Sequence, residues 1–186
     1  MKKITVYFFG LFFIIIFNFF DATAQDSILF EKLNFENNDI QSIVYSISDD
    51  IDGNVWFATE EGVVRYNSKE TYLYDSNRGL PKNTSNRIYS ILKDKNNSIW
   101  IGSTNGIAFY NSKKDLFESI LNNGNEIIKT NALGFDQKNN IWIAADNGLW
   151  ICDKDKKLKN IIPNIRIFNL FVFKDAIFYT SAFGVY

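Results

Sequence analysis

The fold is decided by a stretch of nine residues that occurs three times along the chain. It reads NVWFATEEG at residues 54–62, SIWIGSTNG at residues 98–106 and NIWIAADNG at residues 140–148. The tryptophans of these copies, Trp56, Trp100 and Trp142, are 44 and 42 residues apart. A repeat of this length, made of short strands and turns, is typical of the blades of a β-propeller.

A weaker fourth copy, AIFYTSAFG, follows at residues 176–184. Phe178 replaces the tryptophan, and its distance along the chain from Trp142 falls to 36 residues. The aspartate of the preceding turn is displaced to Asp175, while Gly184 keeps the place of the terminal glycine. The fourth blade is therefore predicted from fewer features than the first three.

Each copy has strand and turn signals on both sides of the tryptophan. In the first copy, alternating apolar residues and turn clusters predict strands at 42–47, 54–59, 63–66 and 71–74. The second copy repeats this pattern from Arg87 to about Glu118, and the third from Thr130 to about Leu158. We therefore predict an all-β propeller of four-stranded antiparallel blades, with about three and a half to four blades in the chain.

The positions that recur have physical reasons. An aspartate lies six residues before each tryptophan, where its carboxylate can accept hydrogen bonds from turn amides: Asp50, Asp94 and Asp136. A glycine lies six residues after it, as part of an Asn-Gly hairpin signal in two copies: Gly62, Gly106 and Gly148. A small residue two places after the tryptophan lets sheets approach closely: Ala58, Gly102 and Ala144. The tryptophans are predicted to pack between adjacent blades.

The pattern Ile/Val-Trp-Ile/Phe-Gly/Ala, followed by a glycine and an apolar residue, resembles the two-component regulator propeller repeat. The linker Gly79-Leu80-Pro81 before the strand at 88–91 also resembles the blade-to-blade pattern of that family. The resemblance extends from about Leu33 to Tyr186. It implies an exported propeller that perceives a ligand, often a carbohydrate, for a histidine kinase.

The N-terminus has the features of a secretory signal peptide at 1–24. Lys2 and Lys3 precede an apolar run from Ile4 to Phe20, and an A-x-A site ends at Ala24. An uncleaved membrane anchor is the alternative, although the run is short for a span. We divide the remainder into a lead-in segment at 25–39, which could be an outer strand of a closing blade, and four repeats. The repeats are blades at 40–83, 84–126 and 127–162 and a partial blade at 163–186.

This length predicts an incomplete ring, because seven blades would need roughly 300 residues at this period. Three interpretations are open: an N-terminal part of a longer protein, a truncated product, or a ring completed by self-association. The remaining blades would then be partners of this chain, and the full protein could dimerise. An open blade face would also leave apolar surface exposed.

The composition excludes several kinds of chemistry. The sequence contains no histidine, which rules out His-dependent triads, bases and metal ligands. Cys152 is the single cysteine and is interpreted as a packing residue. Residues 25–186 hold 18 basic and 20 acidic residues, a balance that does not predict nucleic-acid binding. We predict no catalytic residue, no metal site and no cofactor, and interpret Asp49, Asp52, Glu60 and Glu61 as turn residues.

Two functions remain open. The first is the ligand-sensing part of a hybrid two-component regulator, in the periplasm or at the surface of a Gram-negative bacterium, with its parent anchored in the inner membrane. The second is an exported propeller that serves as a scaffold in a surface or secretion system, with no kinase. A propeller enzyme is disfavoured, because the repeats lack a non-repeating acid pair. The ligand residues are unknown; Trp150, Tyr72 and Tyr74 are the aromatic candidates outside the strict repeat.

Overall fold

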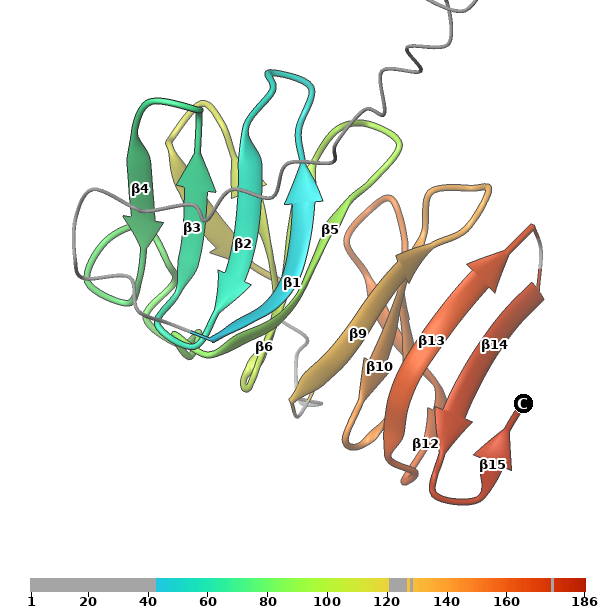
Figure 1. Cartoon of the computed structure of the whole chain (residues 1–186). Coiled ribbons are helices and arrows are strands. Elements are labelled where there is room, and N and C mark those ends of the chain that lie inside the picture. Colours follow the sequence, from blue (N-terminus) through green and yellow to red (C-terminus); the bar gives the residue numbers. More distant parts are fainter. Residues whose placement is uncertain (1–42, 121–126, 128, 175) are drawn as a thin grey trace, which may run out of the picture. The chain divides into compact units, whose positions relative to one another are not determined.

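The computed structural model describes residues 43–120, 127, 129–174 and 176–186. All regular structure in this part of the chain is β-strand, as predicted, and the strands form four antiparallel sheets. Within each sheet the strands are neighbours in chain order (Figure 1). The predicted signal peptide at 1–24 and the lead-in segment at 25–39 lie outside the described residues.

Three sheets have four strands and the last has three. The first sheet consists of β1 (Val44–Asp49), β2 (Val55–Thr59), β3 (Val63–Tyr66) and β4 (Thr71–Tyr74). The second consists of β5 (Ile88–Lys93), β6 (Ile99–Ser103), β7 (Gly106–Asn111) and β8 (Leu116–Ser119). The third consists of β9 (Thr130–Phe135), β10 (Ile141–Ala145), β11 (Gly148–Cys152) and β12 (Leu158–Pro163). The fourth consists of β13 (Ile167–Phe173), β14 (Ala176–Ser181) and β15 (Gly184–Val185).

The strand limits differ from the prediction in two places. The first strand lies two residues later than predicted, because the hairpin closes at Asp50 and leaves Asp49 paired with Val55. The third sheet does not end near Leu158 but continues to Pro163, which pairs with Gly148. Proline donates no backbone hydrogen bond, so it is tolerated in this outer strand, which has no further neighbour in its sheet.

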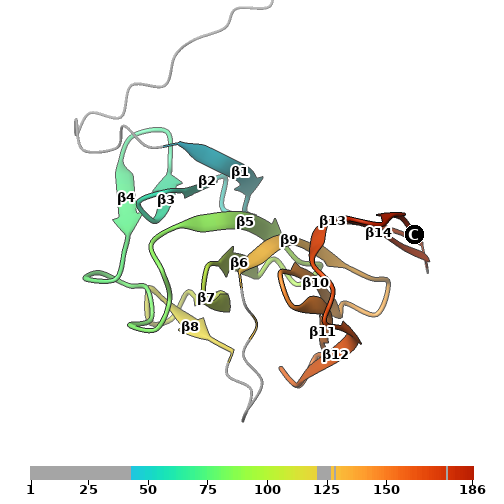
Figure 2. The same ribbon diagram turned by 90° about the horizontal axis from the view of Figure 1, so that it is seen from below.

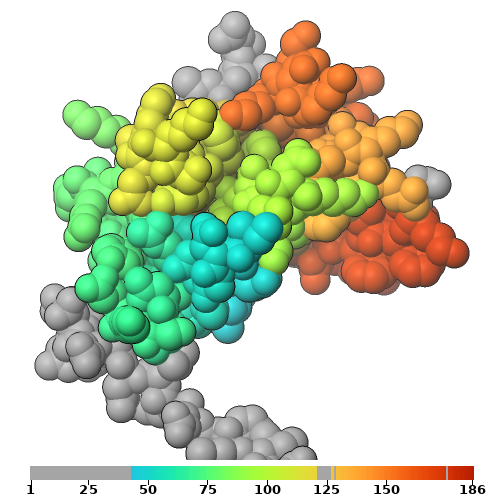
Figure 3. Space-filling view, turned by 90° about the horizontal axis from the view of Figure 1, so that it is seen from above, coloured from blue at the N-terminus to red at the C-terminus, as the bar shows by residue number. Residues whose placement is uncertain are grey.

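The first strand of each sheet packs against the sheet before it. β5 contacts β1 and β2, β9 contacts β5 and β6, and β13 contacts β9 and β10. Figure 2 shows β5 and β9 at the centre, with the fourth strands β4, β8 and β12 at the outside. The space-filling view in Figure 3 shows the same succession of sheets in chain order. This is the arrangement of propeller blades, and the ring is not closed.

The core consists of three clusters, one between each pair of successive sheets. Trp56 packs with Ile91 and Ile101 of the second sheet, and Trp100 packs with Ile141 and Ile143 of the third. The third cluster contains Trp142 of the third sheet together with Ile167, Leu170 and Ile177 of the fourth. The prediction that the tryptophans lie between adjacent blades is confirmed.

A small residue at the predicted position lets the sheets approach closely. A Cβ atom added to Gly102 of β6 would lie 2.4 Å from Cγ2 of Thr130 in β9. The equivalent alanines, Ala58 and Ala144, are fully buried. Side chains at these three positions are therefore limited in size by the next sheet.

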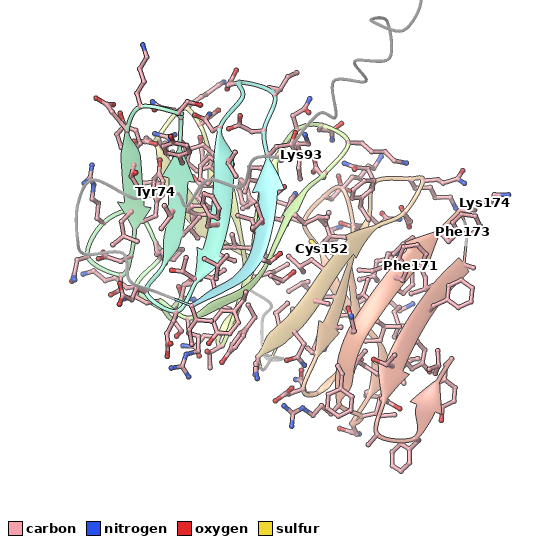
Figure 4. The ribbon with its side chains drawn as sticks, in the orientation of Figure 1. Tyr74, Lys93, Cys152, Phe171, Phe173 and Lys174 are labelled. Atoms are coloured by element: carbon pink, nitrogen blue, oxygen red, sulfur yellow. The ribbon has the colours of Figure 1, made fainter. Side chains whose placement is uncertain are left out.

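The fourth sheet presents an exposed aromatic face. Phe171 and Phe178 are direct partners in the β13–β14 pairing and are 63% and 46% exposed. Phe173, labelled with Phe171 in Figure 4, stacks on it at 6.4 Å between ring centroids. In the other three sheets the corresponding face is covered by the next sheet, and no described residue covers it here.

Candidate functional site

The repeated aspartate and tryptophan form the same hydrogen-bonded unit in each of the first three sheets. In each unit one carboxylate oxygen accepts from two turn amides, and the other accepts from the indole Nε1. The indole bonds are Trp56 to Asp50 at 2.8 Å, Trp100 to Asp94 at 2.9 Å and Trp142 to Asp136 at 3.2 Å. The amide donors are the residues two and four places after each aspartate. One carboxylate therefore shapes the turn and also satisfies a buried indole.

The same hydrogen bonds keep two of these carboxyl groups ionised. Burial raises the pKa of Asp50, but the bonds from Trp56 and Asn54 outweigh it and lower the pKa overall. In Asp136 the bonds from Asn140 and Trp142 likewise outweigh burial, so its pKa is also lowered. These bonds make the carboxylates acceptors within the turn, which is a structural role rather than an acid–base one.

The fourth sheet lacks both members of this unit. By the strand pairing, Phe178 occupies the tryptophan position and Phe173 occupies the aspartate position. Phe173 pairs directly with Ala176, so the turn is shorter than the Asp50–Asn54 turn. The phenylalanine side chain has no N–H group, so no carboxylate is needed to accept a hydrogen bond from it. The sequence assignment of the turn aspartate to Asp175 concerns a residue outside the described part of the chain.

The repeat glycines stand at the start of the strand after the tryptophan strand: Gly62 directly precedes β3, and the other three are the first residues of β7, β11 and β15. Gly62, Gly106, Gly148 and Gly184 have φ values of +150°, +107°, +149° and +133°. A Cβ atom on Gly62 would lie 2.2 Å from the carbonyl oxygen of Tyr74. The hairpins that the Asn-Gly signal predicts are formed at both places, but Asn105 and Asn147 are not among the described residues with positive φ. The glycine alone absorbs the unusual backbone angle because it lies at the end of the turn.

An arginine and several aromatic rings form a cluster between the first two sheets that the sequence did not indicate. The Arg65 guanidinium carbon lies 4.7–5.9 Å from four ring centroids, those of Trp56, Tyr72, Tyr74 and Tyr110. Asp115 accepts from the hydroxyls of Tyr110 at 2.5 Å and Tyr74 at 2.7 Å, and these bonds keep its pKa low. The cluster joins strands of two blades and has its polar groups satisfied internally.

The aromatic candidates outside the strict repeat are mostly buried. Tyr74, labelled in Figure 4, belongs to the cluster just described. Trp150 is buried in the same cluster as Cys152, between the second and third sheets. Tyr72 is half-buried under Arg65, with its hydroxyl bonded to Glu70. Burial raises the pKa of the Cys152 thiol to about 12, so it stays protonated at neutral pH. None of these side chains offers an open face or a nucleophile.

The carboxylates that the sequence interpreted as turn residues lie apart from any metal-binding arrangement. Asp49 pairs with Lys93 at 2.5 Å, and Glu60 pairs with Arg87. The described part of the chain holds no group of three or more His, Cys, Asp or Glu side chains that could bind a metal ion. Within the same residues, no helix is long and apolar enough to cross a membrane.

A β-bulge occurs at the same place in the first strand of all four sheets. The strand pairing shifts by one residue there, and the unpaired residues are Tyr45, Tyr89, Asn131 and Phe168. Bulges bend a strand and redirect a side chain, and they are frequent next to functional sites. Figure 1 shows β1, β5, β9 and β13 side by side, so the bulges follow one another along the inner edge of the blades.

Cations directly precede three of these strands. They are Arg87, Lys129 and Arg166, while Ile43 holds the same place in the first sheet. We call the four bulge residues and these three cations the inner-edge row. It lies where the first strands begin, at the lower end of β1, β9 and β13 in Figure 1. Three of its four bulge residues are aromatic, and three of the four sheets contribute a cation.

Contacts between sheets connect the members of the inner-edge row. The rings of Tyr45 and Tyr89 lie 5.2 Å apart, and Lys129 Nζ lies 4.4 Å from the Tyr89 ring centroid. Asn131 Nδ2 donates to the Ile167 carbonyl at 2.8 Å and to Asp146 at 2.8 Å. The row is therefore continuous across all four sheets.

The four sheets follow one another with equivalent tryptophans packed between them, and this arrangement defines a β-propeller. The family model of the two component regulator propeller matches residues 37–61 and 84–105, in the first two blades. The matched stretches contain the Asp50–Trp56 and Asp94–Trp100 units. No curated protein matches the sequence.

Solved structures share this fold. The extracellular domain of a protein described as a one component system of B. thetaiotaomicron is 20% identical, with a TM-score of 0.64 over 82% of this chain and 22% of that chain. The extracellular domain of a hybrid two component system of the same organism is 21% identical, with a TM-score of 0.61 over 76% of this chain and 19% of that one. This chain therefore spans about a fifth of the length of those domains.

A third similar structure is an enzyme. Catalytically inactive virginiamycin B lyase from Staphylococcus aureus is 16% identical, with a TM-score of 0.63 over 81% of this chain and 52% of that chain. At this identity the likeness concerns the fold alone. The family model that matches this chain is that of a regulator propeller.

Proposed function

We propose that this chain is the N-terminal part of an exported β-propeller domain that senses a ligand for a two-component signalling protein with a histidine kinase. The observation that carries the proposal is the match of the two component regulator propeller model to two of its blades. The likeness to extracellular domains of bacterial signalling systems is consistent with it. Ligand binding would shift the population of the propeller towards a signalling state.

We further propose that the chain is not itself catalytic. It contains no histidine at all, whereas the inactive form of the similar lyase is described as the variant of a histidine. Its repeat carboxylates are engaged with turn amides and indoles, as the Asp94 unit illustrates. The sensing role therefore rests on recognition by side chains rather than on reaction.

Two measurements test the proposed function. The coding sequence after residue 186 should encode a membrane-spanning helix and a histidine-kinase core. A second propeller with a C-terminal sorting domain would instead support the scaffold function. In cells, a saccharide panel should induce a reporter of the regulated genes, and induction should be lost when the propeller is deleted. Induction that persists without the propeller would contradict the proposal.

Export has its own test. The N-terminus of the mature protein, determined by sequencing the extracytoplasmic form, should be Gln25, which follows the predicted A-x-A site. An alkaline phosphatase fusion to the full chain should be active. The same fusion without residues 1–24 should be inactive. Equal activity of both fusions would contradict export through this segment.

A further inference from the structure

We propose that the inner-edge row binds a small ring-shaped ligand that carries a carboxylate or sulfate group. The proposal rests on the proposed function in one respect, namely that the propeller recognises a ligand. It adds the place of binding and the chemical class of the ligand. The argument uses the geometry of the row, its exposed rings and its charges.

The geometry of the row is built into every blade. Each first strand begins with the same bulge, between the pairs Val44/Ser46, Ile88/Ser90, Thr130/Ala132 and Ile167/Asn169. The bulge residue has no partner residue opposite it in its own sheet, so its side chain can contact the neighbouring sheet instead. Four sheets thus bring four such side chains to one inner edge, where a single small molecule can contact several blades.

The row offers aromatic faces to solvent. Tyr45 is 40% exposed and Phe168 is 45% exposed, and the tilted Tyr45–Tyr89 pair forms a continuous aromatic surface across two blades. Elsewhere in the first two sheets the rings of Trp56 and Tyr74 are almost fully buried. Exposed rings held on a rigid sheet are suited to stacking against the apolar face of a sugar or another flat ring.

The row also contains a cation without a carboxylate partner among the described residues. Arg87 is paired with Glu60, and Arg166 Nε is paired with Asp146 at 2.9 Å. Lys129 has no carboxylate partner among the described residues, and its ammonium group lies over the Tyr89 ring. Lys129 is therefore the cation of the row that is not paired with a carboxylate among the described residues. An anionic group on the ligand would supply the missing counter-charge beside Tyr89.

The same features argue against a nucleic acid as the ligand. The whole chain has a net charge of −1, and the cations of the row are single residues on separate blades. A polyanion needs a longer basic surface to release enough counterions. One anionic group next to one ring is the chemistry that the row matches.

The test compares two sugars that differ only at one carbon. We would titrate the full chain with D-glucuronate and with D-glucose by calorimetry at low salt. Glucuronate should bind about tenfold more tightly, because the carboxylate gains a charge-assisted bond. Lys129→Gln should remove most of that preference and leave the affinity for glucose unchanged. Tyr45→Ala should weaken both sugars.

Lys138→Gln is the matched control. Lys138 is an exposed lysine of the same sheet, in the Asp136–Asn140 turn that follows β9, at its opposite end. Its replacement changes the net charge equally and should not alter glucuronate binding. Circular dichroism of both variants should be the same as that of the parent chain.

Three results would overturn the proposal: no heat of binding with glucuronate, equal affinity for the two sugars, or equal effects of the Lys129 and Lys138 variants. The proposed function fails separately. If a neutral saccharide from the panel binds the full protein and Lys129→Gln leaves that affinity unchanged, sensing stands and the anion site does not. If glucuronate binds through Lys129 but no saccharide induces the reporter, the site stands and the signalling role does not.

Discussion

The first three sheets and the fourth sheet are built on the same repeat, but the exposure and the hydrogen bonding of its central aromatic residue differ between them. Trp56 and Trp100 are 1% and 6% exposed, and each indole donates to a carboxylate of its own turn. Phe178 is 46% exposed, its side chain has no N–H group, and Phe173 stands at the place of the turn aspartate. The comparison teaches that the aspartate and the tryptophan act as one unit, and that burial of the aromatic residue depends on the sheet that follows.

The largest difference should come from removing the aromatic residue itself. Trp56→Ala should lower the free energy of unfolding by about 3–5 kcal/mol, because it empties the space between two sheets. Phe178→Ala should lower it by less than about 1 kcal/mol, because that side chain is largely in solvent. Urea denaturation of both variants checks this. Equal losses would show that Phe178 is as well packed as Trp56.

The aspartate comes next in magnitude. Asp94→Ala should cost about 2–3 kcal/mol, because it leaves the buried Trp100 indole and two turn amides without an acceptor. Asp153→Ala is the control: Asp153 accepts from the amides of Asp155 and Lys157 in the same way but from no indole. The loss of stability in Asp153→Ala should be smaller than that in Asp94→Ala by at least about 1 kcal/mol.

A double-mutant cycle sharpens this comparison. Trp100→Phe removes the N–H donor and imitates the residue type of the fourth sheet. If Asp94 and Trp100 act as one hydrogen-bonded unit, Asp94→Ala should lower the free energy of unfolding by less in the Trp100→Phe background than in the parent chain. Strictly additive losses would show that the aspartate acts on the turn alone.

The close approach of the sheets should give an effect of similar or smaller size. Gly102→Ala should lower the free energy of unfolding by about 1–3 kcal/mol, because the new methyl group would collide with Thr130 Cγ2. Thr130→Ser removes that methyl group and keeps a hydroxyl to donate to the Gly106 carbonyl. The double variant should therefore recover stability relative to Gly102→Ala. If stability is not recovered, the loss in Gly102→Ala comes from the backbone and not from the contact with the Thr130 methyl group.

The pH dependence should be the smallest effect. The pKa values of Asp50 and Asp136 are lowered in the folded chain, so folding favours their ionised forms. Their stabilisation is complete above the unfolded pKa, near pH 4, and is lost as the pH falls through the folded values. Asp50→Asn should flatten the fall in stability below pH 4, as measured by urea midpoints. An unchanged pH profile would contradict the hydrogen-bond assignment.

The architecture followed from the sequence because its signals are local. The spacing of Trp56, Trp100 and Trp142 predicted the sheets and the packing of the tryptophans between them. The strand limits were less accurate at β1 and β12, where the end of a strand depends on which residue closes the hairpin. Phe178 was placed in the repeat from sequence, but its exposure depends on a neighbouring sheet and not on its own segment.

The contacts that cross blades could not be predicted in the same way. The Arg65 cluster joins residues of two repeats, and only a cation flanked by tyrosines in consecutive strands could have suggested it. The inner-edge row was not predicted from the sequence, because a bulge is defined by the pairing with the partner strand, and the sequence of one strand does not reveal that pairing. One signal was available: Arg87, Lys129 and Arg166 each stand directly before a first strand.

The bulges have a consequence for how such a protein can change. Residues 45, 89, 131 and 168 already hold two tyrosines, an asparagine and a phenylalanine on one unchanged backbone. An unpaired position tolerates such variety, because its side chain does not set the strand register. Asn131 differs from the other three in that its amide also joins the third and fourth sheets. A combinatorial library restricted to these four codons should therefore yield mostly folded variants with altered selectivity, whereas the same diversity at the tryptophans should yield mostly insoluble chains.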